Sequence, residues 1–489
     1  MRKRTSDIHL VITAALHNEI PKDWFESCGV AVHTLAALKS GALKQRTGPG
    51  TGVLMVLTGA GLRASEEAAY WIRDTLTPLF VLNIGTCGII DKQCATGKWL
   101  LPKFAVDESG DIFELDTRLP VPCPEEVMNV NSLLSVTKAM SGNVPAKWKK
   151  HTLLDMECYS QAKVFHETGI TFHCLKFGTD YSDSNTHSDF NKNLPLFREE
   201  TKKLFGFLNT NSQGIQITAV IPVFNRERMI RRAIDSVLSQ SFMPEEIIVV
   251  DDCSTDGTSD ILECYRDKIK VIRLPDNSGP STARNEGIKH ASTGWIAFLD
   301  SDDSWEKDKL KNQVAYLMKY PFYRIMQSEE KWIRNGKRVN PCMHHKKPFG
   351  WIWEQSLERC LVSPSGVLLA KALIERHGGF DEHLPVCEDY ALWLKISRHQ
   401  PAGLESGLSV IKYGGHTDQL SYKYHAMDRF RVKSLVNLLS EELHPDFRRK
   451  IIHVLEKKLR ILINGYEKRE KSGDAQDCRN ILDSIKEFQ

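Results

Sequence analysis

The stretch Phe298-Leu299-Asp300-Ser301-Asp302-Asp303 joins two apolar residues to three carboxylates and one serine. Carboxylates this close repel one another and raise one another's pKa unless a positive charge lies nearby. A divalent cation that carries the phosphates of a substrate would remove this cost, and Mg²⁺ and Mn²⁺ prefer hard oxygen ligands of this kind. An acidic, solvated loop after a strand would contain the same residues, so the flanking sequence has to decide between the two interpretations.

Upstream of this stretch, short apolar runs alternate with turns and with helical patterns. Between the first two runs, apolar residues in 229–238 recur on one face of a helix, which Asn225 and the next two residues would cap. Another helix would open near Asn277. This alternation predicts an α/β domain with a largely parallel sheet. The runs predicted as strands are 216–224, 247–250, 270–274 and 295–299.

This region contains six short motifs in a fixed order. They are Val-Ile-Pro-Val-Phe-Asn at 220–225, Val-Asp-Asp-Cys-Ser-Thr-Asp-Gly-Thr at 250–258, Ser-x-Ala-Arg-Asn at 281–285, Leu-Asp-Ser-Asp-Asp at 299–303, Gly-Gly-Phe-Asp-Glu at 378–382 and Glu-Asp-Tyr-Ala-Leu-Trp-Leu at 388–394. Together they resemble the motifs of the family 2 glycosyltransferases, which have the GT-A fold, and the resemblance covers about residues 216–425. It implies transfer of a sugar from a nucleotide-sugar donor, with a UDP-sugar expected, to an acceptor that the sequence does not identify.

The same resemblance suggests a role for individual residues. Asp300, Asp302 and His416 would hold Mn²⁺ or Mg²⁺, which would neutralise the departing diphosphate; a free surface position is the alternative for His416. Asp389 is the expected base that takes a proton from the acceptor hydroxyl, and Glu388 is the other candidate. In-line attack of this kind would invert the anomeric configuration. The residues expected at the nucleotide-sugar site are Pro222, Phe224, Asn225, Asp251, Asp252, Arg284 and Asp300.

Two of these assignments have a physical reading beside the resemblance. Asp251 and Asp252 follow a predicted strand, where one of the two carboxylates would accept a hydrogen bond from the base or the ribose of the donor. Arg284 would contact phosphate, or it would form a structural ion pair that holds the acidic loops together.

The first two hundred residues show the same alternation of strands, glycine-rich turns and helices. Runs at 10–16, 53–57 and 80–84 are predicted strands, and 65–76 is a predicted helix. Ligands in α/β sheets bind beyond the carboxyl ends of the strands. Glu19 and the turns that begin at Gly59 and Gly85 would lie on that edge, where glycine lets the backbone approach a ligand closely.

This part of the chain resembles the purine nucleoside phosphorylase superfamily, and most closely its 5′-methylthioadenosine/S-adenosylhomocysteine nucleosidase branch. The resemblance implies that Glu19 handles the attacking water and that Met156 and Glu157 bind the ribose. Asp180 would protonate the purine leaving group, and cleavage of an N-glycosidic bond does need an acid at the base and a carboxylate near the sugar. The matching segments, in family order, are 14–19, 59–61, 83–88, 97–102, 155–157 and 179–180.

One segment departs from the nucleosidase pattern. Between Gly142 and Asp155 the chain looks shorter than in the nucleosidases, and Lys147 and Trp148 stand where an aromatic base contact is normal. A purine is therefore only the default base, and the attacking group, water or phosphate, is open. Two interpretations follow: a bifunctional enzyme that also hydrolyses a nucleoside, or a transferase regulated by an inactive nucleoside-binding sensor domain.

The predicted organisation is a phosphorylase-like domain at 1–207, a linker at 208–215, a GT-A domain at 216–425 and a helical tail at 426–489. In the tail, apolar residues such as Ile451, Leu455 and Leu459 form a stripe among many basic residues. Such a helix packs on its own domain, forms a homodimer, or lies on a membrane or partner surface.

Bulk composition narrows the remaining partners. The net charge of +3 over 489 residues gives no reason to expect nucleic acid as a partner. The twelve cysteines form no Cys-x-x-Cys pair, and no segment approaches the roughly 18 apolar residues of a membrane span. With no signal peptide recognised, the expected location is the cytoplasm and the cysteines are expected to be reduced.

Overall fold

The computed structural model divides into two compact units, residues 1–211 with 316–322 and residues 212–315 with 323–489. The domain boundaries drawn from the sequence stay a prediction. The residues that the structure describes are 7–16, 19–41, 51–122, 126–140, 142, 144–166, 168–209, 214–339, 346–415, 424, 426–441 and 443–485.

The first unit is built around a mixed sheet, in which the described residues form nine strands. Their order is β2-β3-β1-β4-β8-β7-β5-β6, and β9 pairs with β4 and β5. Because β1, β3, β4 and β9 run parallel, their carboxyl ends share one edge. The strands are β1 (Leu10–Ala14), β2 (Ala31–Thr34), β3 (Val53–Leu57), β4 (Phe80–Ile89), β5 (Trp99–Val106), β6 (Ile112–Glu114), β7 (Val127–Ser135), β8 (Leu153–Asp155) and β9 (Thr171–Asp180).

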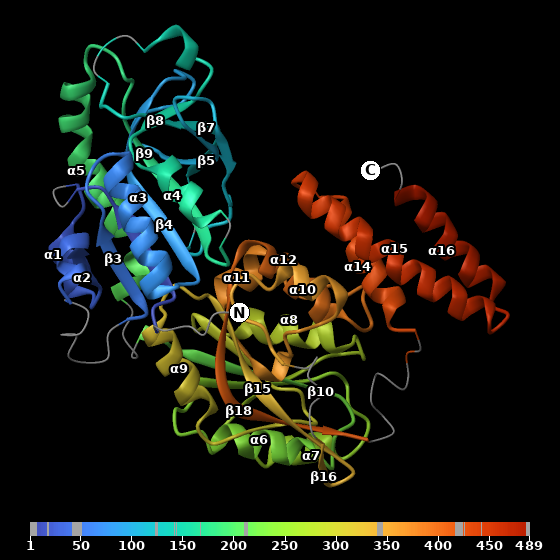
Figure 1. Cartoon of the computed structure of the whole chain (residues 1–489). Helices are drawn as coiled ribbons and strands as arrows, with labels where there is room; N and C mark the ends of the chain where they lie inside the picture. The colour runs from blue at the N-terminus through green and yellow to red at the C-terminus, as the bar shows by residue number, and fades with distance from the viewer. Residues whose placement is uncertain are drawn as a thin grey trace. The chain divides into compact units, whose positions relative to one another are not determined.

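Helices pack on this sheet through a core of buried apolar side chains (Figure 1). The predicted helix at 65–76 is present as α3 (Leu62–Trp71), which continues as one π-helical segment, η2 (Ile72–Leu76). The other helical segments are α1 (Lys22–Ser27), α2 (Leu35–Lys39), η3 (Ala146–Trp148), α4 (Cys158–Phe165), α5 (Thr186–Leu204) and η4 (Gly206–Asn209).

The predicted turn at Gly85 is wrong, because β4 continues through Gly85 to Ile89. Beyond Ile84 this strand keeps partners on both sides: β9 pairs with it in parallel, and β8 pairs antiparallel at Gly88 and Ile89. A Cβ at Gly85 would lie 3.5 Å from Nζ of Lys176. That distance is an ordinary contact, so Gly85 is simply a residue within a paired strand and does not form a turn.

The second unit contains another mixed sheet of nine described strands, ordered β12-β11-β10-β13-β17-β15-β18-β14, with β16 paired to β15. β10, β11, β12 and β13 are parallel, and β17 runs antiparallel to β13. The parallel strands agree closely with the predicted ones, so the α/β class holds in both units. The strands are β10 (Ile217–Val223), β11 (Glu246–Asp251), β12 (Lys270–Arg273), β13 (Trp295–Phe298), β14 (Ser304–Trp305), β15 (Ile325–Arg334), β16 (Lys337–Val339), β17 (Val367–Ala370) and β18 (Ala402–Gly414).

Helices lie on both faces of this sheet, with α8, α11 and α12 on one face and α6 and α7 on the other (Figure 1). The predicted apolar stripe of α6 is buried. These helices place the turns that follow β10, β11 and β13 at one edge of the sheet. The helical segments are α6 (Ile230–Leu238), α7 (Thr258–Glu263), α8 (Pro280–His290), α9 (Lys309–Lys319), α10 (Trp353–Glu358), η7 (Pro364–Gly366), α11 (Lys371–Arg376) and α12 (Glu388–His399).

The prediction that Asn225 caps α6 is wrong, because that helix begins only at Ile230. Asn225 adopts a left-handed φ of 50°. Its Oδ1 accepts a hydrogen bond from the backbone N–H of Thr255 at 2.8 Å, and its own backbone N–H donates to Oγ of Ser254 at 3.0 Å. Asn225 thus joins the turn after β10 to the turn after β11.

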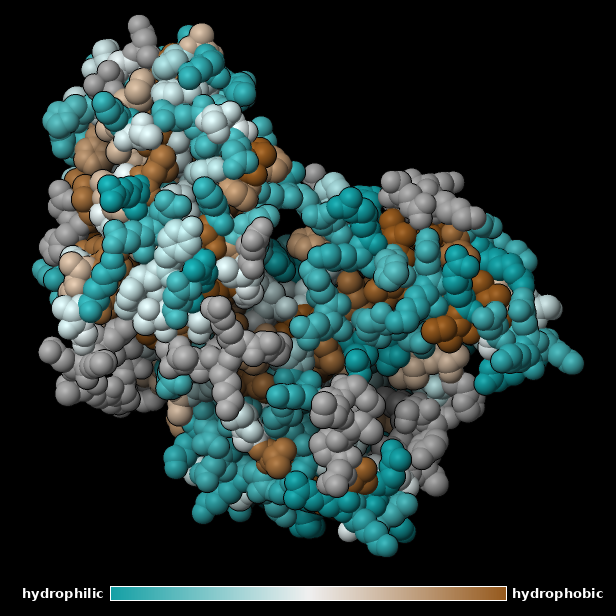
Figure 2. Space-filling view, viewed as in Figure 1, coloured by the Kyte–Doolittle hydropathy of each residue, from teal (hydrophilic) through white to brown (hydrophobic). Residues whose placement is uncertain are grey.

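The C-terminal helices are α14 (Asp428–Leu439), α15 (Pro445–Glu467) and α16 (Ser472–Ser484). α14 packs against α12, α15 packs against α10, and α16 packs against α15. The predicted stripe, including Ile451, Leu455 and Leu459, is buried in their shared core, so it is not an open membrane or partner surface. Figure 2 shows apolar residues on the visible face of this helical region bordered by polar ones. None of the described helices is both long and apolar enough to cross a membrane.

Candidate active sites

A cavity of about 1370 Å³ opens in the second unit, beyond the carboxyl ends of β10, β11 and β13. Asp251 is not among the described residues that line the cavity, and the predicted His416 lies outside the described residues. The structure thus gathers side chains from segments up to 167 residues apart in the chain. The predicted residues that line the cavity are Pro222, Phe224, Asn225, Asp252, Arg284, Asp300, Asp302, Glu388 and Asp389.

The carboxylates of Asp251, the last residue of β11, and of Asp252, the next residue, have different partners. Asp252 accepts hydrogen bonds from the backbone N–H groups of Ser278 at 2.7 Å and Gly279 at 2.8 Å, where α8 begins. Burial raises the pKa of Asp252. Asp251 instead accepts from the backbone N–H of Ser254 at 3.0 Å and from Oγ of Ser259 at 3.2 Å. Asp252 is therefore placed to meet a ligand, whereas Asp251 holds the turn.

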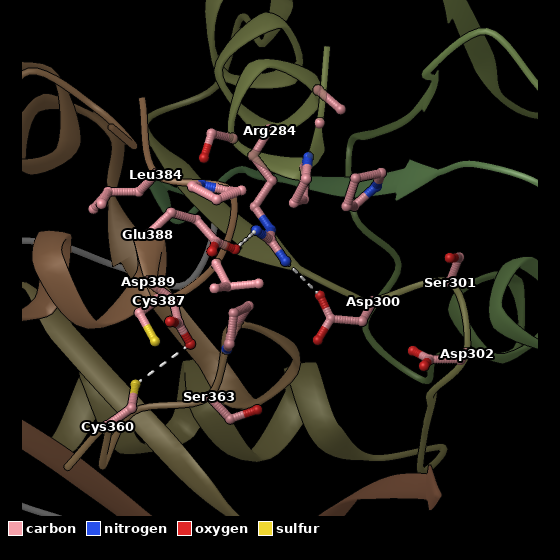
Figure 3. A pocket seen from close by; sticks show the side chains of 18 of the residues that line it. Arg284, Asp300, Ser301, Asp302, Cys360, Ser363, Leu384, Cys387, Glu388 and Asp389 are labelled. Carbon is pink, nitrogen blue, oxygen red and sulfur yellow. Dashed lines mark hydrogen bonds and ion pairs between the residues drawn. The ribbon is translucent and has the colours of Figure 1, made fainter. Parts of the chain in front are cut away.

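Arg284 bridges two acidic residues at the floor of the cavity, as the dashed lines in Figure 3 show. Its Nη2 lies 2.8 Å from Oδ1 of Asp300, and its Nη1 lies 2.7 Å from Oε1 of Glu388. Only 5% of Arg284 is exposed. Burial opposes ionisation of Asp300, but Arg284 and Lys412 outweigh it and lower the pKa of Asp300 to about 2. Arg284 thus forms the ion pair that was one of its two predicted roles.

Lys412, which the sequence did not single out, lies in the same acidic cluster. Its Nζ is 3.0 Å from Oδ2 of Asp303 and 3.5 Å from Oδ2 of Asp300. Ser365 donates its hydroxyl to Asp303 at 2.6 Å. Burial disfavours the charged lysine, but Asp303 and Asp300 hold the pKa of Lys412 well above its usual value. A positive charge was expected beside the acidic run, and Lys412 with Arg284 supplies it.

The oxygen atoms of Asp302 and Asp300 fit a hard divalent cation chemically. Asp302 is half-buried and lines the cavity, and its main-chain oxygen accepts from Arg232 at 2.5 Å, which fixes the turn. Asp300 already has Arg284 near one carboxylate oxygen and Lys412 near the other. Asp302, together with Asp300, could therefore hold Mn²⁺ or Mg²⁺ at this end of the cavity.

The two candidate bases, Glu388 and Asp389, begin α12, which follows a left-handed residue, Cys387, with φ of 62°. Glu388 is held by Arg284, and burial raises its pKa to about 7. Asp389 is half-buried: its Oδ1 accepts from the backbone N–H of Tyr390 at 2.7 Å, and its Oδ2 accepts from the thiol of Cys360 at 3.4 Å (Figure 3). Asp389 is therefore the carboxylate more open to an acceptor.

In the first unit, the structure surrounds Glu157 with two further charged groups. Lys176, fully buried in β9, has its Nζ 2.9 Å from Asp155 and 3.8 Å from Glu157. Glu157 also accepts a long hydrogen bond, 3.4 Å, from the backbone N–H of Gly61. Burial, together with repulsion by Glu157, raises the pKa of Glu19 to about 7. Glu19 and Glu157 are thus neighbours, and Lys176 was missed because a lone lysine in an apolar run gives no signal.

Asp180 ends β9 at the same sheet edge. Its carboxylate accepts from the backbone N–H of Ser182 and the hydroxyl of Thr179, both at 2.9 Å, and burial raises its pKa. Gly59 turns after β3 with a left-handed φ of 84°. Met156 is half-buried against a small apolar cluster.

Comparison with known proteins assigns the second unit to a family. The model "Glycosyl transferase family 2" matches residues 218–360. A putative teichuronic acid biosynthesis glycosyltransferase, TuaG of Bacillus subtilis, is 32% identical over 184 residues, which are 37% of this chain and 71% of TuaG. The chain belongs to glycosyltransferase family 2.

Two further glycosyltransferases are similar in sequence to this chain. The UDP-Glc:alpha-D-GlcNAc-diphosphoundecaprenol beta-1,3-glucosyltransferase WfgD of Escherichia coli is 31% identical over 199 residues, which are 40% of this chain and 76% of WfgD. An uncharacterized glycosyltransferase of Rickettsia felis is 32% identical over 223 residues, which are 44% of this chain. The chain spans only 37% of the length of that protein.

A solved structure of 5′-methylthioadenosine/S-adenosylhomocysteine nucleosidase from Helicobacter pylori is also similar. Its TM-score is 0.33 at 14% identity, and the match covers 41% of this chain and 97% of the nucleosidase.

Proposed function

We propose that the second unit transfers a sugar from a UDP-sugar to an acceptor hydroxyl with inversion of the anomeric configuration. The observation that carries this proposal is one cavity that contains both a half-buried carboxylate, Asp389, and the acidic pair Asp300 and Asp302. A UDP-sugar is favoured because the similar protein WfgD is a UDP-Glc glucosyltransferase. The acceptor is left open, since these relatives differ in their products.

Each end of the cavity would perform a different step. Asp252 and the turn held by Asn225 would contact the base and ribose of the donor. Asp302, with Asp300, would hold Mn²⁺ or Mg²⁺, which when bound supplies Lewis-acid neutralisation of the diphosphate. Asp389 would accept the proton of the acceptor hydroxyl while the oxygen of that hydroxyl bonds to the anomeric carbon. The bond from that carbon to the diphosphate breaks, and UDP leaves.

A screen of UDP-sugar hydrolysis with Mn²⁺ tests the proposal. The wild-type chain is expected to release UDP from at least one UDP-sugar, and Asp302→Ala is expected to lose this release. Asp267→Ala is a matched control, because Asp267 is exposed and does not line the cavity. The absence of both UDP release and UDP binding in the wild type would overturn the assignment.

We also propose that the first unit hydrolyses the N-glycosidic bond of a nucleoside, with a purine as the default base. Three buried carboxyl groups support this proposal: Glu19, Glu157 and Asp180. Because burial raises the pKa of Asp180, this group can keep a proton for the leaving base. Glu19 would position the water, and Glu157, kept near Lys176, would bind the ribose hydroxyls.

Incubation of the full chain with methylthioadenosine, adenosine and inosine tests this second activity. Free base is expected from the wild type and not from Glu19→Gln or Asp180→Asn. Glu26→Gln is the control, because Glu26 is exposed on α1. Binding of a nucleoside without release of base would favour a sensor that regulates the transferase.

A further inference from the structure

The acidic end of the transferase cavity contains a positively charged side chain, that of Lys412. Lys412 lines the cavity from β18, and 16% of its side chain is exposed. Its ammonium group lies 3.0 Å from Asp303 and 3.5 Å from Asp300. The ammonium group is therefore fixed by carboxylates, on a side chain that is partly exposed and lines the cavity.

The charges around Asp300 show why this position matters. In the described structure, Arg284 and Lys412 are the two cavity-lining residues with ion pairs to Asp300. Arg284 also forms a second ion pair, with Glu388 at 2.7 Å. An ammonium group has three hydrogens, and the ion pairs of Lys412 with Asp303 and Asp300 leave a third for a ligand.

Lys347, the other buried lysine of the lining, has a different partner. Its Nζ lies 2.8 Å from Glu330, and both side chains are less than a tenth exposed. Of these two lysines, Lys412 is the one with ion pairs at the Asp300 end of the cavity, where Asp300 and Asp302 would hold a metal and a diphosphate.

We propose that Lys412 binds the diphosphate of the nucleotide-sugar donor, so that a nucleoside diphosphate still binds this site when divalent metal is removed. The inference rests on the proposed function of the second unit, because it takes the donor diphosphate to lie at the Asp300–Asp302 end. Lys412 and the metal would share the same phosphate charge, one from β18 and the other from the turn after β13.

Calorimetric titration of the full chain with UDP, GDP and dTDP, in EDTA and in Mn²⁺, tests the inference. The wild type is expected to bind at least one of them in EDTA. Lys412→Met should weaken that affinity by about tenfold or more, with a smaller loss in Mn²⁺, where the metal carries part of the charge. Lys412→Arg should keep most of the affinity, since the charge remains.

Two further variants keep the test interpretable. Lys371→Met removes a lysine of similar exposure, 21%, whose Nζ donates to a main-chain oxygen outside the cavity, and it should bind nucleotide as the wild type does. If Lys412→Met does not fold, the double variant Lys412→Met with Asp303→Asn removes the buried partner charge as well, and the same loss of affinity in EDTA is expected.

Three outcomes would count against the inference. If Lys412→Met binds the nucleotide in EDTA as tightly as the wild type does, Lys412 is only structural, even when the melting temperature falls. If the wild type binds with Mn²⁺ but not in EDTA, the inference fails while the proposed donor site stands. If no nucleoside diphosphate binds under either condition, the donor assignment itself fails, and the inference with it.

Discussion

At the scale of single residues, the candidate base of the transferase is held by two hydrogen bonds from different elements. One comes from the backbone N–H of Tyr390, and the other comes from the thiol of Cys360. Burial keeps the pKa of Cys360 well above its usual value, so the thiol stays protonated and can donate. The orientation of the Asp389 carboxylate is therefore fixed by a hydrogen bond to each of its two oxygens.

This geometry predicts a measurable role for the thiol. Cys360→Ala should lower kcat for sugar transfer by about three- to tenfold, the worth of roughly 1 kcal/mol for a weak hydrogen bond, with little change in KM for the donor. Cys360→Ser, which keeps a donor, should recover most of the rate. Initial rates across pH check this prediction, and equal rates for all three proteins would contradict it.

Glu19 predicts a pH dependence of stability in the first unit. Its folded-state pKa of about 7 exceeds the reference value of 4.5. Its stabilising contribution is therefore full below pH 4.5 and is lost as pH rises through 7, by up to about 3 kcal/mol. Residue 19 cannot ionise in Glu19→Gln. The melting temperature of this variant minus that of the wild type should therefore increase as the pH rises from 5 to 8. A constant difference between the two proteins over this range would refute the prediction.

Ion-pair partners that lie far apart in the sequence were the least predictable residues. The carboxylate run at 300–303 implied a nearby cation, because like charges are costly when they are close. Which residue provides it depends on the pairing of strands, since Lys412 is brought to Asp303 from β18 more than a hundred positions later. Lys176 was missed for the same reason: the partner that explains it, Asp155, lies on another strand.

At the scale of elements, the packing of α8 on β10 depends on one missing side chain. A Cβ at Gly287 would lie 2.3 Å from Cγ1 of Val220, which is far inside contact distance. This close approach sets how near the helix that carries Arg284 lies to the sheet.

Gly287→Ala should therefore destabilise the second unit by about 1–3 kcal/mol, the usual cost of overpacking. Gly294→Ala is the control, because a Cβ there would meet open space and its φ is not in the left-handed region. Chemical denaturation of the two variants checks the difference, and equal stability would show that α8 moves without cost.

Elements with a strong local pattern were predicted well. The run 53–57 is β3 residue for residue, and the apolar stripe of 229–238 is the buried face of α6. The errors at Gly85 and Asn225 have one cause, because both residues carry typical turn signals. Strand partners decide the first, and a hydrogen bond to Thr255 decides the second; neither is visible in the local sequence.

At the scale of the whole molecule, the two units contain separate sets of carboxylates. Asp389→Asn should abolish sugar transfer, by roughly a hundredfold or more, and leave nucleoside hydrolysis unchanged. Glu19→Gln should do the reverse. Both reactions are to be followed in the same preparation of the full chain. A loss of transfer in Glu19→Gln would instead indicate that the first unit controls the second.

The C-terminal helices share a core with the helix that presents the base. Tyr390, one residue after Asp389, is buried among side chains of α14 and α15, and its hydroxyl donates to the main-chain oxygen of Leu357 at 2.7 Å. Asp389, Tyr390 and the helices α14 and α15 thus lie outside the stretch 218–360 that the family model matches, whereas Leu357 and Cys360 lie within it. Family members that share the donor-binding part but differ in these helices would therefore hold the base differently. The position of the base could then vary between relatives while the donor site stays the same.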